Sequence, residues 1–197
     1  PNDGPPSPAF DEQRAAAYRA WWEFTPTRVA PPTGNSLPIH RTVDWGGLTR
    51  FVLLDTRQYR MRGSMLGADQ ERWLLRGLTD SAAGWDVLAQ QVFFAPRRGG
   101  KSGTWGEFTG SRERVVRGWT EAGVRNAVVL TGDIHSHWAA TVHASPGDTS
   151  TPTVATELVT SSISSGGDGS DTRADVEAIL PDNPHIRYFS NRRGYLR

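Results

Sequence analysis

The sequence contains no cysteine. Disulfides, thiolate nucleophiles and cysteine-bound zinc sites are therefore excluded from this chain, and any metal site must use oxygen and nitrogen ligands. Lysine is almost absent too, because Lys101 is the only lysine among 22 basic residues. Arginine suits bidentate phosphate contacts, but the base composition of the gene is the stronger explanation of this bias.

The sequence also lacks long apolar runs and an excess of charge of either sign. No run of about 18 apolar residues is present that could span a bilayer, and the first residues lack the basic and apolar regions of a signal peptide. The formal net charge of +1 gives no strong field that would draw the protein onto nucleic acid or an anionic membrane. Any preference for phosphate must come from a local site.

The length and the hydrophobic pattern predict one α/β domain. With 197 residues, of which 37% are hydrophobic, the chain can bury one substantial core. Strand-like and helix-like segments alternate, which favours an α/β or α+β layered sandwich over an all-β fold. The expected helices start at Asp11, Gly67 and Ser111. The expected strands cover 37–43, 48–55, 85–94, 126–131, 138–144 and 153–160, the first two forming a hairpin around Gly46 and Gly47.

The clearest chemical feature is the segment Gly132-Asp133-Ile134-His135 at the end of an apolar strand. If the backbone stays extended, Asp133 and His135 project to the same side and can share a metal site. His137 could act as a further ligand, a proton donor or a phosphate contact. The alternative is an ordinary strand end, in which Asp133 caps the loop and the histidines are surface or core residues.

A second polar turn, Asp55 to Arg60, also follows a strand expected to be buried. Arg57 or Arg60 could clamp a phosphoryl group, although a structural ion pair between Asp55 and Arg57 explains the pattern more simply. The glycine-rich loop of residues 99–110 carries Glu107. We expect this loop to be irregular and close to the cleft that contains Asp133, with Glu107 directed toward Asp133.

At these residues the chain resembles PhoD-like alkaline phosphatases, a family within the calcineurin-like metallophosphoesterase superfamily. The matching segments run in family order over almost the whole chain. They are AFDEQRAAAYRAWWEFTPTR, FVLLDTRQYR, QERWL, WDVLAQQVFFAP, SRERVVRGW, NAVVLTGDIHSHWA, TELVTSSISSGG and NPHIRYFSNRRGYLR.

The resemblance implies part of a four-layer αββα fold and hydrolysis of phosphate esters by metal-activated water or hydroxide. It implies two or more divalent or trivalent ions, drawn from Ca, Fe, Mn and Zn. Asp133 and His135 match the family's metal-site residues, and Glu107 is the candidate replacement for a family acid displaced by one position. His137 and Arg57 are the candidate catalytic residues, and Arg60 is the candidate substrate contact.

The resemblance also implies that residues 1–197 form the C-terminal part of one catalytic domain, truncated at both ends. The missing N-terminal half would then be needed to complete the metal site. Family members resemble exported enzymes, so we expect a secreted or cell-envelope protein. Two alternatives stay open: a phospholipase D-like phosphodiesterase, and an incomplete scaffold that binds no metal and has no catalytic activity.

Overall fold

The structure is a computed structural model that describes residues 7–99, 103–165 and 169–197. The chain divides into two compact units, residues 1–40 and residues 41–197. Within the described residues, no helix is both long enough and apolar enough to cross a membrane.

The first unit contains the helix α1 (Pro8–Phe24). Its N-cap is Ser7, whose side chain accepts a hydrogen bond from the backbone N–H of Phe10, and proline occupies the first helical turn, where no N–H partner is needed. The helix was expected to start at Asp11, and it begins three residues earlier, at Pro8, with Ser7 as its cap. Asp11 instead accepts a hydrogen bond of 2.7 Å from the side chain of Asn35.

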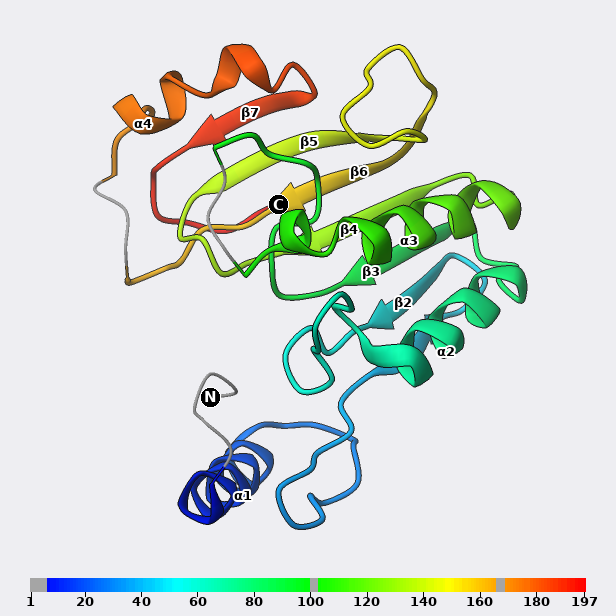
Figure 1. The fold of residues 1–197 in the computed structure, drawn as a ribbon, viewed down its shortest axis with the longest axis vertical. Helices are drawn as coiled ribbons and strands as arrows, with labels where there is room; N and C mark the ends of the chain where they lie inside the picture. The colour runs from blue at the N-terminus through cyan, green and yellow to red at the C-terminus, as the bar shows by residue number, and fades with distance from the viewer. Residues whose placement is uncertain (1–6, 100–102, 166–168) are drawn as a thin grey trace. The chain divides into compact units, whose positions relative to one another are not determined.

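The second unit is built on one mixed sheet of seven strands, in the order β1-β2-β3-β4-β6-β5-β7 (Figure 1). Neighbouring strands among β2, β3, β4 and β6 pair in parallel, whereas β1, β5 and β7 pair antiparallel with their neighbours. The strands are β1 (Arg41–Trp45), β2 (Thr49–Leu53), β3 (Trp85–Ala89), β4 (Ala127–Thr131), β5 (His137–His143), β6 (Thr153–Val159) and β7 (Ile186–Ser190). An α/β fold was predicted from the sequence, and it is confirmed.

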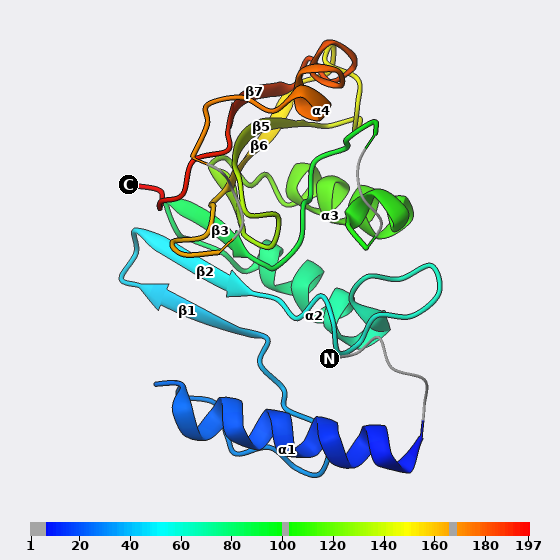
Figure 2. The same cartoon turned by 90° about the vertical axis from the view of Figure 1, so that its left-hand side faces the viewer.

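Helices cover one face of this sheet. In both views α2 (Gly67–Thr79) and α3 (Thr109–Glu121) lie side by side against it (Figures 1 and 2), and an ion pair between Glu71 and Arg114 joins them. The shorter elements are α4 (Ala174–Glu177), η1 (Trp105–Glu107) and η2 (Leu180–Asp182).

The two faces of the sheet differ in burial. In β4, Ala127, Val129 and Thr131 are buried, whereas the alternating residues between them are only half-buried. Strand β2, which was expected to be buried, shows the same difference: Val52 is buried, whereas its neighbours on the strand, Phe51 and Leu53, are half-buried. The described residues contain one sheet, so the second sheet of the expected four-layer fold is not among them.

Several predicted boundaries shift. The strand expected to reach Phe94 ends at Ala89, because the next residues leave the sheet and bury Phe93 and Phe94 in the core. Helix α3 begins at Thr109 rather than Ser111. Strand β7 was not predicted at all. The hairpin is confirmed: Gly46 adopts a φ of 56° in its turn, a conformation that glycine takes without steric cost.

A buried carboxylate, Glu157 of β6, joins three parts of the second unit. It accepts hydrogen bonds of 2.8 Å from the backbone N–H groups of both Phe94 and Ala95, and one of 2.7 Å from the hydroxyl of Thr131. The Thr131 hydroxyl in turn accepts from the side chain of Gln90. Burial raises the pKa of Glu157, and these hydrogen bonds act in the opposite direction.

We predict that Glu157→Gln destabilises the protein. One carboxylate oxygen becomes an NH2 group facing a backbone N–H donor, which should lower the free energy of unfolding by about 1–3 kcal/mol. The raised pKa of Glu157 also stabilises the native state of the wild type below the unfolded pKa of about 4.3, and this contribution is lost as pH rises through the folded pKa. The difference between wild type and variant should therefore narrow from about pH 5 to about pH 8.

Urea unfolding of both proteins at the two pH values measures this difference. Thr156→Ser, on the other face of β6, is the control and should change stability little. A difference between wild type and Glu157→Gln that widens with pH would contradict the raised pKa.

Candidate functional site

The candidate site lies where parallel strands end. Strands β2, β3 and β4 run in parallel, so the segments that follow them emerge at the same edge of the sheet. Residues 55–57 follow β2, and residues 132–136 follow β4. Ligand sites in open α/β sheets are commonly found at this carboxyl edge.

The loop after β4 is tightly turned instead of extended. The backbone N–H of Ile134 donates to the carbonyl of Gly132 at 2.9 Å, which closes a three-residue turn centred on Asp133. Asp133 has a φ of 71° and His135 a φ of 53°. The condition of an extended backbone, under which Asp133 and His135 would project to the same side, is therefore not met. Both residues occupy the left-handed region, which is costly for residues other than glycine and is often found at functional sites.

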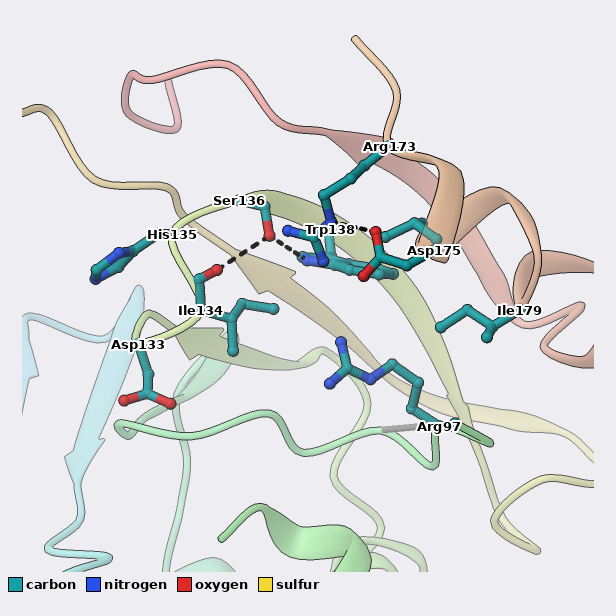
Figure 3. A pocket seen from close by; sticks show the side chains of 11 residues that line it. Arg97, Asp133, Ile134, His135, Ser136, Trp138, Arg173, Asp175 and Ile179 are labelled. Atoms are coloured by element: carbon teal, nitrogen blue, oxygen red, sulfur yellow. Dashed lines mark hydrogen bonds and ion pairs between the residues drawn. The ribbon is translucent and has the colours of Figure 1, made fainter. Parts of the chain in front are cut away.

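Buried hydrogen bonds hold this loop in place. The hydroxyl of Ser136, which is buried, donates to the carbonyl of Ile134 at 3.3 Å and accepts from the indole N–H of Trp138 at 2.8 Å. Figure 3 shows both bonds, with the imidazole of His135 pointing away from them. Ser136 and Trp138 therefore fix the backbone from which Asp133 and His135 extend.

The structure brings Arg57 and Asp133 together. The Nη2 atom of Arg57 lies 3.4 Å from Oδ1 of Asp133, and the Asp133 side chain is 41% exposed. Asp55 does not pair with the Arg57 guanidinium, which was the simpler explanation of that segment. Its carboxylate accepts from the backbone N–H groups of Arg57 and Gln58, at 2.9 and 2.8 Å. Asp55 therefore shapes the turn, and the guanidinium of Arg57 is directed to Asp133.

A pocket of about 380 Å³ opens beside the loop after β4 (Figure 3). Its lining combines the loop residues with side chains from the segment after β3 and from the region of α4. The lining residues are Arg97, Gly99, Asp133, Ile134, His135, Ser136, Trp138, Arg173, Asp175, Val176 and Ile179. Asp133 was expected at the end of a buried central strand, facing a polar cleft, and the pocket agrees with that expectation.

Four predicted site residues lie outside this lining: Arg57, Arg60, Glu107 and His137. Arg60 donates to the carbonyls of Thr56 and Gly103, at 3.2 and 3.1 Å. The carboxylate of Glu107 accepts from the backbone N–H of Gly103 at 2.9 Å. Arg60 and Glu107 thus both contact the same loop, and Glu107 belongs to the helical turn η1 rather than to an irregular segment; residues 100–102 of the expected loop lie outside the described residues.

His137 is the first residue of β5 and is buried. Its Nδ1 atom accepts a hydrogen bond of 3.3 Å from the backbone N–H of Ser161. Nε2 faces Gly194, where an added Cβ would lie 3.4 Å away. The catalytic role of His137 stays a prediction.

Among the described residues, no three acidic or histidine side chains lie close enough together to hold a metal ion. Asp133 and His135 can supply one carboxylate and one imidazole, and Glu107 does not join them.

Sequence reasoning missed Arg97, which lines the pocket. The signal was present in the sequence, because the pair Arg97 and Arg98 directly follows an apolar segment.

Comparison with known proteins agrees with these features. Residues 2–197 match the family model described as PhoD-like phosphatase. The chain is 39% identical to alkaline phosphatase D of Bacillus subtilis (strain 168), in an alignment that covers 100% of this chain and 38% of that protein. A solved structure described as the structure of PhoD matches with a TM-score of 0.91 and 39% identity, over 99% of this chain and 42% of that one.

The chain thus spans about two fifths of the length of both relatives, at 38% and 42%. The resemblance inferred from the sequence motifs is confirmed over nearly every residue. The chain belongs to the PhoD-like phosphatase family.

Proposed function

We propose that the protein hydrolyses phosphate esters by attack of a metal-activated water or hydroxide on phosphorus. The main observation that supports this proposal is the turn after β4, which places Asp133 and His135 at the carboxyl edge of the sheet beside a pocket. Membership of the PhoD-like phosphatase family supports the reaction class.

The donor types fit hard and borderline metal ions. Asp133 supplies carboxylate oxygens and is 41% exposed, and its one contact with a charged group in the described chain is to Arg57. His135 is exposed and supplies an imidazole nitrogen. Such a mixed O and N set suits Ca, Fe, Mn or Zn, and we propose two or more ions, with the remaining ligands contributed by the part of the domain that the longer relatives contain.

The chain's own residues hold and orient the reacting groups. Bound metal ions would polarise the phosphoryl oxygens and lower the pKa of a coordinated water. The Arg57 guanidinium, which lies beside Asp133, orients that carboxylate and can donate to a phosphoryl oxygen as negative charge develops on it. The carboxylate of Asp55 accepts a hydrogen bond from the backbone N–H of Arg57 and so fixes the backbone of Arg57.

Measurements of phosphate release and of metal content also test two other functions. Phosphodiester hydrolysis of the phospholipase D-like kind uses the same metal chemistry and differs in preferring diesters over monoesters. A scaffold without catalytic activity would retain no metal after purification and dialysis. We also propose export to the cell surface or beyond, which fractionation of the producing cells tests.

We predict that Asp133→Ala abolishes phosphatase activity and lowers the metal content. Removing a carboxylate weakens cation binding and removes several kcal/mol of charge compensation, so turnover should fall roughly 100-fold or more. The fold should survive because the Asp133 side chain is partly exposed. Phosphate release and elemental analysis of the purified protein measure the two effects.

His143→Ala is the matched control. His143 lies at the far end of β5, where its Nδ1 contacts the carbonyl of Thr151 at 2.7 Å. Its loss should affect stability more than turnover or metal content. Near-normal turnover with full metal content in Asp133→Ala would refute the proposed site.

Glu107→Gln tests the remaining candidate ligand. The Gln oxygen can still accept from the backbone N–H of Gly103, so the loop should keep its shape. Because Glu107 is directed to its own loop, we expect the variant to keep the metal content and turnover of the wild type within about twofold. A loss of metal with an unchanged melting temperature would identify Glu107 as a ligand.

A further inference from the structure

Arg97 is a cation in the pocket that has no assigned role. Its guanidinium stacks over the rings of Phe93 and Trp138, with its central carbon 4.8 and 5.1 Å from the ring centres. Within the described residues it makes no hydrogen bond or ion pair, and its Nε atom is buried without a partner. The Nε–H has therefore lost water without gaining a hydrogen-bonding partner, which is costly unless a ligand supplies one.

The backbone on both sides of Arg97 is held firmly. Glu157 accepts from the N–H of Ala95, and the ring Nε2 of His185 lies 2.5 Å from the carbonyl of Pro96. Asn183 bonds to both the N–H and the carbonyl of Arg98, at 2.9 and 3.2 Å. Arg97 therefore extends from a backbone segment that is already ordered. Binding of a ligand would cost little conformational entropy in this segment.

The carboxylates near Arg97 in the described part of the chain do not neutralise it by direct contact. Asp175 is paired with Arg173 at 2.6 Å, and the oxygens of Glu157 accept from backbone N–H groups. Burial lowers the pKa of Arg97, with the charge of Glu157 opposing this effect, but an arginine stays charged at neutral pH. Among residues 7–99, 103–165 and 169–197, no carboxylate contacts this guanidinium, so this end of the pocket carries a positive charge that none of them neutralises directly.

Arg97 lies in a different part of the pocket from Asp133 and His135, where the proposed reaction takes place. In Figure 3, Asp133 and His135 lie at one end, Ile134 projects between, and the guanidinium of Arg97 lies on the other side of Ile134. Val176 and Ile179 add apolar surface to the wall near Arg97. If a phosphoryl group is held beside Asp133, an ester substituent that extends over Ile134 would therefore approach Arg97.

We propose that Arg97 determines specificity by binding an anionic group, a carboxylate or a second phosphate, on the organic part of the phosphate ester. The inference rests on the proposed hydrolysis for the position of the phosphoryl group. The preferred substrate class is then a phosphate ester with an apolar spacer that ends in a negative charge. A charge-assisted, partly desolvated contact of this kind is worth about 10-fold to 100-fold in affinity.

Binding of two phosphonates that cannot be hydrolysed tests the proposal. Calorimetry on the metal-loaded protein would compare phenylphosphonate with 3-carboxyphenylphosphonate, which differ only in the distal carboxylate. Wild type should bind the carboxylated compound at least about 10-fold more tightly. Arg97→Gln should bind both about equally, and Arg97→Lys, which keeps the positive charge, should keep part of the preference.

Arg98→Gln is the matched control, because Arg98 is the neighbouring residue and does not line the pocket. It should keep the wild-type preference. Equal affinity of wild type for the two phosphonates, or an unchanged preference in Arg97→Gln, would overturn the proposal. Near-ultraviolet circular dichroism of each variant checks that Trp138 keeps its packing.

Phosphate release from phenyl phosphate and 3-carboxyphenyl phosphate separates this inference from the proposed function. If wild type hydrolyses neither ester but keeps the binding preference, hydrolysis is wrong and the anion site stands. If it hydrolyses both equally well and shows no binding preference, the function stands and the role of Arg97 is wrong.

Discussion

The buried carboxylate of Glu157 is the constraint on which the site depends. A buried charge without partners is strongly unfavourable, so the oxygens of Glu157 must be met by donors, and those donors come from the end of β4 and from the segment after β3. The same three bonds therefore place Thr131, one residue before the Gly132–Ser136 turn, and Ala95, two residues before Arg97. The hydrogen bonds of one buried side chain therefore position the segments at both ends of the pocket.

The polar residues at the carboxyl edge fall into two groups. Asp55, Arg60 and Glu107 have hydrogen bonds to nearby backbone groups, so their side chains shape loops. Asp133 and His135 project from a turn that other residues stabilise, and their side chains are exposed. Residue type does not distinguish the groups, because both contain carboxylates. The groups differ in whether the side chain already forms a hydrogen bond with a backbone group.

This difference explains what the sequence could predict. The alternation of apolar segments predicted the α/β class and most strands, and the GDIH motif pointed to Asp133 and His135. Strand β7 was missed because its pattern, IRYFS, depends on pairing with β5, which is distant in sequence. The direction of the Arg57 guanidinium and the stacking of Arg97 also depend on contacts between distant segments, and local patterns contain no information about them.

The left-handed turn at Asp133 and His135 shows why a motif of four residues can specify a site. Glycine would adopt these φ values of 71° and 53° without strain, yet the chain places an acid and a histidine there, at a cost of order 1–3 kcal/mol each. Stability alone does not favour that choice. The hydrogen bonds of Ser136 with Ile134 and Trp138 hold this turn. A carboxylate and an imidazole therefore leave one tight turn beside the pocket, where they can supply two of the metal ligands that the proposed chemistry needs.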